Sequence, residues 1–149
     1  NAIEVARNFF SEIGAVAIAN HTFFCIEPNP VAYNCDFITT AKEGVELVSA
    51  VDSPGFALHL DIAGMTLAKD DIVGSIHDAA PILRHFHASS PYLELVDPSD
   101  GVRHDLAASA LKDINYKGVV SIEMKAAEPG KNVERVESAV RYIQSIYNS

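Results

Sequence analysis

The sequence has 149 residues, 48% of them hydrophobic, which is enough to build a folded core and is not typical of a disordered chain. The formal net charge of −9 and the lack of any Lys/Arg cluster argue against a nucleic-acid-binding surface. The apolar stretches are too short and too interrupted to span a bilayer, and no signal peptide opens the chain, so we expect a cytoplasmic protein without membrane contact. Two cysteines, Cys25 and Cys35, make no disulfide framework, and we expect both to be reduced.

We expect residues 1–149 to form a single domain. Because the chain starts at Asn1, without Met and already inside a helical pattern, we also expect it to be processed or to be a fragment of a longer protein. Four short apolar runs rich in β-forming residues predict strands, and a loop is expected after Asp61. The predicted strands are 22–26, 56–60, 82–87 and 119–122.

Helical patterns separate these strands. Apolar residues at helical spacing predict a first helix from residue 2 to about residue 20. Thr40 with Glu43 predicts a capping box for a helix that ends at Val51. The remaining helices are predicted from Asp70 or Asp71 to about residue 80, near 104–114, and from a cap at Asn132 onward.

Strands that are apolar on both faces and alternate with helices indicate an α/β fold with a parallel sheet covered by helices. Four such units could form a small doubly wound sheet or half of a (β/α)8 barrel. No glycine-rich phosphate loop follows the first strand, where Pro28-Asn29-Pro30 stands instead. This disfavours a doubly wound sheet that binds nucleotides.

Each predicted strand ends in a residue that can bind a metal ion. These residues are Glu27, Asp61, His87 and Glu123. The carboxyl ends of parallel strands meet at one edge of the sheet, so we expect the four side chains to converge. Three carboxylates and one imidazole suit Mn²⁺, Mg²⁺ or Co²⁺ better than a structural Zn²⁺. The alternative is that all four are ordinary polar residues facing solvent, which their repetition at equivalent places disfavours.

Five further residues are candidates for substrate binding: Asn29, His59, His85, His104 and Lys125. Alternation places His59 and His85 on the same face as the candidate ligand two residues later; the alternative for both is a buried, hydrogen-bonded histidine. For Asn29 the alternative is a turn-forming residue, and for His104 a surface residue at a helix start. Lys125 either binds a substrate anion or pairs with Glu123. No nucleophile elbow surrounds Ser89-Ser90, which disfavours a serine hydrolase.

The segments Glu27-Pro28-Asn29-Pro30, Leu60-Asp61, His85-Phe86-His87 and Tyr116 to Glu123 resemble the second half of xylose isomerase-like TIM barrels. This superfamily includes ketose 3-epimerases, other sugar and sugar phosphate isomerases, and endonuclease IV. The resemblance covers nearly the whole chain, from the fourth helix of the barrel to the eighth, and the spacing between successive candidate ligands is similar to that of the ketose epimerases.

The resemblance implies one divalent metal ion, with Mn²⁺ expected and Mg²⁺, Co²⁺ or Zn²⁺ as alternatives, held by Glu27, Asp61, His87 and Glu123. It also implies that Glu27 and Glu123 act as an acid/base pair in the isomerisation or epimerisation of a sugar or sugar phosphate. Two other functions stay open: a metal-dependent lyase, dehydratase or endonuclease IV-like hydrolase, and an inert half-barrel. Either a homo-oligomer or a separate amino-terminal half-barrel is expected to supply the missing strands.

The chain departs from the family pattern at three positions. Gly64 stands where the family often has a His, Leu93 where the epimerases have an Arg, and Tyr33 where they have a second substrate-side Glu. The Asp-Arg-His motif of the endonuclease appears here as Val102-Arg103-His104, which keeps its histidine. A three-zinc nuclease site therefore cannot be built from these residues alone, and the identity of the substrate does not carry over.

Overall fold

Helices and strands alternate along residues 2–148, which are the residues that this computed structural model describes. The strands are β1 (Phe24–Ile26), β2 (Phe56–Asp61), β3 (Leu83–Ser89) and β4 (Val119–Glu123). The α-helices are α1 (Ala2–Ala19), α2 (Ala41–Val51), α3 (Ile62–Ala68), α4 (Ile72–Ala79), α5 (His104–Asp113) and α6 (Asn132–Tyr147). Two short 3₁₀-helices, η1 (Val31–Tyr33) and η2 (Pro91–Leu93), lie in the loops that follow β1 and β3.

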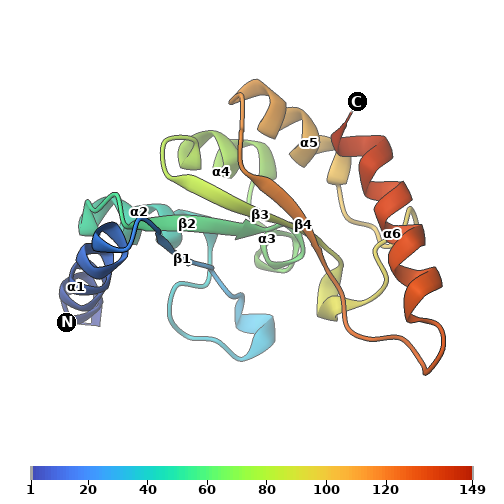
Figure 1. The fold of residues 1–149 in the computed structure, drawn as a ribbon, viewed down its shortest axis with the longest axis horizontal. Coiled ribbons are helices and arrows are strands. Elements are labelled where there is room, and N and C mark those ends of the chain that lie inside the picture. Colours follow the sequence, from blue (N-terminus) through green and yellow to red (C-terminus); the bar gives the residue numbers. More distant parts are fainter. Residues whose placement is uncertain (1, 149) are drawn as a thin grey trace.

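The strands form one parallel sheet in the order β1-β2-β3-β4, which is also their order along the chain. Helices α1, α2, α4, α5 and α6 contact one another in that same order and make a continuous row along the sheet (Figure 1). A doubly wound sheet would reverse direction and place helices on both faces, whereas an unbroken progression of strand and helix is the geometry of a (β/α) barrel. The predicted α/β fold, with about half the strands of such a barrel, is confirmed.

The core lies between the sheet and this row of helices. Leu58 and Leu60 of β2 and Phe86 of β3 are almost fully buried there. Burying each of these side chains contributes about 1.5–3 kcal/mol. Because side chains alternate across a strand, the residues that alternate with them along β2, His59 and Asp61, face the other side of the sheet. The hydrophobic pattern that packs the helices therefore also fixes the face on which the polar residues lie.

Two predicted helix starts are confirmed in detail. Thr40 and Glu43 make both hydrogen bonds of a capping box at the start of α2. Of the two aspartates considered for α4, Asp71 is the cap, since its side chain accepts a hydrogen bond from the Gly74 backbone. Asp70 instead accepts a 2.9 Å hydrogen bond from the Ala41 nitrogen. It thus ties the loop before α4 to the first turn of α2.

Two local predictions were wrong. The segment after Asp61 is not a loop but helix α3, and Asp61 itself is its N-cap. The helix is only seven residues long and contains Gly64, which weakens the helical pattern in the sequence. Asn132 does not cap α6 but is its first residue, and Lys131 takes the cap position. The Asn132 side chain accepts a hydrogen bond from the Ala127 backbone in the preceding loop instead.

Within the described residues, no helix combines the length and the apolar character needed to cross a membrane. Cys25 and Cys35 are both free thiols and both half-buried. Burial raises the pKa of Cys25. Neither cysteine therefore contributes a covalent link to the fold.

Candidate metal centre

The residues that end the four strands converge. Glu27 directly follows β1, Asp61 and Glu123 end β2 and β4, and His87 lies near the end of β3. One ligand atom from each of these four residues lies within 4.8 Å of the others. In a flat parallel sheet, β1 and β4 would be about 14 Å apart, because strands are spaced by about 4.8 Å. The curvature of the sheet and the inward direction of the side chains therefore create this four-residue group.

His87 Nδ1 lies among the three carboxylates. It is 3.3 Å from Glu123 Oε2 and 3.8 Å from both Glu27 Oε1 and Asp61 Oδ2. This nitrogen is buried and makes no hydrogen bond. Two atoms bound to one divalent ion at about 2.0–2.2 Å are at most about 4.4 Å apart, and these three distances from His87 Nδ1 lie within that limit. The unpartnered nitrogen and the oxygen-rich donor set thus both fit a divalent cation.

The electrostatics of the group favour a cation. Burial, and then the nearby carboxylates of Asp61 and Glu123, raise the pKa of Glu27 from 4.5 to about 7. Without a cation, the three carboxylates therefore cannot all be ionised near neutral pH without mutual repulsion. His59 shows the opposite shift, since burial and the neighbouring His87 and His85 lower its pKa to about 3. Its imidazole is neutral at neutral pH and keeps a free lone pair.

Asp61 is held in place through both of its carboxylate oxygens. Ser89 Oγ donates a 2.5 Å hydrogen bond to Oδ2, and the Gly64 nitrogen donates a 2.6 Å hydrogen bond to Oδ1. Ser89 is fully buried and also accepts a hydrogen bond from the Ala63 nitrogen at 3.3 Å. This contact is not among those predicted from the sequence, in which Ser89 is a candidate only for a nucleophile. Alternation along β3, which places Ser89 on the same face as His87, is the signal that could have found it.

Three of the five candidate substrate-binding residues lie beside the four-residue group. Asn29 donates a hydrogen bond of 3.3 Å from its side chain to the Glu27 carbonyl. His59 Nδ1 lies 3.7 Å from Glu27 Oε2. The His59 and His85 ring centroids are 4.0 Å and 5.0 Å from that of His87.

The other two candidates have different partners from those considered. His104 is buried rather than on the surface. Its Nδ1 lies 3.1 Å from the Tyr147 hydroxyl, and its Nε2 lies 3.4 Å from Asp100 Oδ2. Burial lowers the pKa of His104. The charge partner of Lys125 is Glu94, not Glu123. His104 thus helps pack α5 against α6, and Lys125 ties the chain after β4 to the loop after β3.

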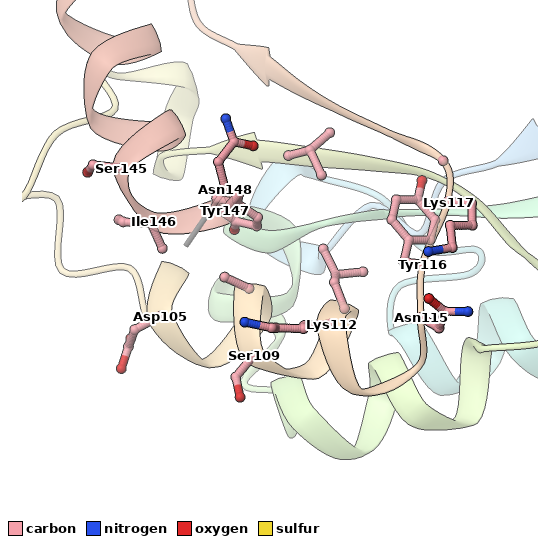
Figure 2. A pocket seen from close by; sticks show the side chains of 14 residues that line it. Asp105, Ser109, Lys112, Asn115, Tyr116, Lys117, Ser145, Ile146, Tyr147 and Asn148 are labelled. Carbon is pink, nitrogen blue, oxygen red and sulfur yellow. The ribbon is translucent and has the colours of Figure 1, made fainter.

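One pocket in the described part of the chain lies away from these residues. It has a volume of about 860 Å³ and is lined by α5, the 115–118 turn and the end of α6 (Figure 2). Figure 2 shows Lys112, Tyr116 and Asn148 among its lining side chains. The turn precedes β4, so the cavity lies beside the amino end of that strand. None of the four converging residues lines it, and in (β/α) barrels the chemistry gathers at the opposite, carboxyl end.

The comparisons with known proteins agree with this architecture. The family model described as xylose isomerase-like TIM barrel matches residues 1–146. A D-psicose 3-epimerase of Ruminiclostridium cellulolyticum is 34% identical over 113 residues, which are 75% of this chain and 38% of that protein. The solved structure of a D-psicose 3-epimerase with D-tagatose from Clostridium cellulolyticum matches with a TM-score of 0.83 and 24% identity, over 97% of this chain and 56% of its own.

A structure of the IOLI protein with a bound zinc atom also matches, with a TM-score of 0.81 and 21% identity, over 98% of this chain and 56% of its own. The chain thus spans about half the length of these solved relatives. The family model covers nearly all of the sequence, and the parallel strands in sequential order agree with the fold of that family. The chain therefore belongs to the xylose isomerase-like TIM barrel family.

Proposed function

We propose that this chain is the carboxyl-terminal part of a sugar isomerase or epimerase that moves a proton at the carbon next to a carbonyl. The observation that carries the proposal is the convergence of Glu27, Asp61, His87 and Glu123 within 4.8 Å. Its support is the family membership and the 34% identity to a D-psicose 3-epimerase. The substrate class is a ketose or a similar sugar, free or phosphorylated.

The four-residue group would hold one divalent cation, with Mn²⁺ expected and Mg²⁺, Co²⁺ or Zn²⁺ as alternatives. Such a cation, when bound, would polarise the carbonyl and hydroxyl oxygens of the substrate. Asp61 and His87 would then serve mainly to bind it. This division of roles is consistent with the two hydrogen bonds that already fix the Asp61 carboxylate.

Glu27 and Glu123 would be the acid and the base. They come from the two outer strands of the sheet and face the same space. One carboxylate would take the proton from the carbon beside the carbonyl, and the other would return a proton to the opposite face of that carbon. Proton transfer by carboxylates placed in this way commonly contributes about 10²–10⁴-fold to a rate.

We further propose that activity requires the remaining strands of a barrel, supplied by a longer protein or by another chain. β1 and β4 are the edges of the sheet, and each carries an exposed apolar residue: Phe24 is 49% exposed and Val119 is 63% exposed. Unpaired strand edges and exposed apolar side chains are unfavourable in an isolated domain. The solved relatives extend over nearly twice this length.

The test is a hydrogen-exchange and epimerisation assay. The chain is incubated in D₂O with Mn²⁺ and either D-psicose or D-fructose, alone and together with a separately produced amino-terminal half of the R. cellulolyticum epimerase. We expect deuterium at carbon 3, detected by NMR, only when both halves are present. Glu27→Gln and Glu123→Gln should each abolish it, while Glu134→Gln, which changes an exposed carboxylate of α6, should not.

The proposal would be contradicted if neither sugar exchanged a proton under any of these conditions, or if the Glu123→Gln variant still catalysed exchange. Cleavage of abasic DNA by the same mixture would instead favour the hydrolase alternative. The unpaired edges make the inert half-barrel the second candidate. It would be favoured if the reconstituted protein bound Mn²⁺ but exchanged no proton.

A further inference from the structure

Three histidines meet on the inner face of the sheet, on two adjacent strands. His59 of β2 is the register partner of His85 of β3, and His87 follows two residues later on the same face. The ring centroids of the three pairs are 4.9 Å, 4.0 Å and 5.0 Å apart, with planes inclined by 73° to 83°. The sheet therefore holds three imidazoles edge to face. His59 and His85 are not part of the four-residue group.

Two of these imidazoles, those of His59 and His87, have a buried nitrogen that makes no hydrogen bond. His59 is 8% exposed, and its Nε2 is buried without a hydrogen-bond partner. A buried polar nitrogen that lacks a partner is unfavourable unless a ligand satisfies it. One nitrogen from each ring lies within 4.8 Å of the others. A candidate set of three nitrogen ligands is thus already assembled by the strand register.

We propose that His59, His85 and His87 form a second cation site, specific for a borderline transition metal such as Zn²⁺, Ni²⁺ or Cu²⁺. Imidazole ligands favour these metals, whereas the carboxylate-rich group favours Mn²⁺ or Mg²⁺. Two nitrogens bound to one zinc ion are at most about 4.2 Å apart, because each Zn–N bond is about 2.0–2.1 Å long. The side chains must therefore rotate inward for all three nitrogens to bind one ion.

The two sites share His87, so occupancy of one affects the other. Zn²⁺ bound by the imidazoles competes for the ring that the carboxylate group needs, and we expect it to lower the apparent affinity for Mn²⁺. The identity of the bound metal would then depend on which ions are present. This inference does not depend on the proposed epimerase activity, because its tests measure metal binding alone.

The first test uses the unmodified chain with Cu²⁺ as the probe. Electron paramagnetic resonance reports how many nitrogens coordinate the copper, through their superhyperfine splitting. The imidazole site predicts the pattern of three nitrogens. A pattern of a single nitrogen would show that Cu²⁺ sits in the carboxylate group, and it would overturn the proposal.

The second test is a calorimetric titration with Zn²⁺ of the Glu123→Gln variant, which weakens the four-residue group but keeps all three imidazoles. We expect one Zn²⁺ site in this variant. Adding His85→Gln should weaken that site at least 10-fold, since losing even an indirect support of a metal ligand costs about 10–100-fold. Adding His21→Gln instead, at an exposed position after α1, should have no effect. Equal zinc affinity in the His85 and His21 variants, or no zinc site in Glu123→Gln, would contradict the proposal.

Discussion

The Ser89 hydroxyl donates a 2.5 Å hydrogen bond to the same Asp61 oxygen, Oδ2, that lies 3.8 Å from His87 Nδ1. Ser89→Ala removes this donor and frees the carboxylate to rotate about its remaining hydrogen bond from the Gly64 nitrogen. A hydrogen bond to a charged group is worth about 1.5–3 kcal/mol. If the conformation that binds the metal loses this free energy, the affinity for Mn²⁺ falls by about 10–150-fold. We therefore expect Ser89→Ala to weaken Mn²⁺ binding by one to two orders of magnitude.

The adjacent Ser90 provides a matched control for this experiment. Ser90 is equally buried and donates a 2.6 Å hydrogen bond to a carboxylate, but its partner is Asp100, outside the four-residue group. Ser89→Ala and Ser90→Ala should therefore lose similar stability in urea unfolding, whereas only Ser89→Ala should lose Mn²⁺ affinity in calorimetry. Equal Mn²⁺ affinities in the two variants would refute a positioning role for Ser89.

Three further predictions concern protons, packing and capping. Because Glu27 has a raised pKa of about 7, binding of Mn²⁺ below that pH should release close to one proton, and affinity should rise about tenfold per pH unit up to about pH 7. Calorimetry in buffers of different ionisation enthalpy would detect this proton. If the Glu27→Gln variant released the same proton on binding Mn²⁺, the proton would not come from Glu27. Gly55→Ala should destabilise the fold by about 1–3 kcal/mol or more, since an added Cβ would lie 2.1 Å from the Gly14 carbonyl oxygen; an unchanged melting temperature would disprove this. Thr40→Ala should cost about 1 kcal/mol through the lost cap of α2, without changing Mn²⁺ affinity.

The convergence of the four strand-end residues could be predicted from the sequence because it depends on two local rules. Strand alternation fixes the face of each side chain, and parallel strands bring their carboxyl ends to one edge. These rules assign Glu27 and Glu123 to the carboxyl edge of the sheet without any information on long-range contacts. The helical row likewise follows from apolar positions such as Leu47, which face the sheet at helical spacing.

Contacts that depend on the path of a loop could not be predicted in this way. Asp100 lies in the long loop after β3, and its burial against Ser90 and His104 depends on the path that this loop takes before α5. Helix α3 is hard to predict because it is short and contains Gly64, and because its cap, Asp61, also has the pattern of a metal ligand. Asp61 makes both contacts at once, since its Oδ1 caps α3 while its Oδ2 faces His87.

A calorimetric titration with Mn²⁺ tests the central claim most directly, on the unmodified chain, on Asp61→Ala and on Asp71→Ala. Asp71 is a control for the loss of a helix cap, because both aspartates accept a hydrogen bond from a glycine nitrogen three residues on, at 2.6 Å for Asp61 and 3.2 Å for Asp71. Only Asp61 belongs to the four-residue group. We predict one Mn²⁺ per chain in the unmodified protein and in Asp71→Ala, and none in Asp61→Ala. No binding by the unmodified chain, or equal binding by both variants, would contradict the proposal that these four strand ends form a metal site.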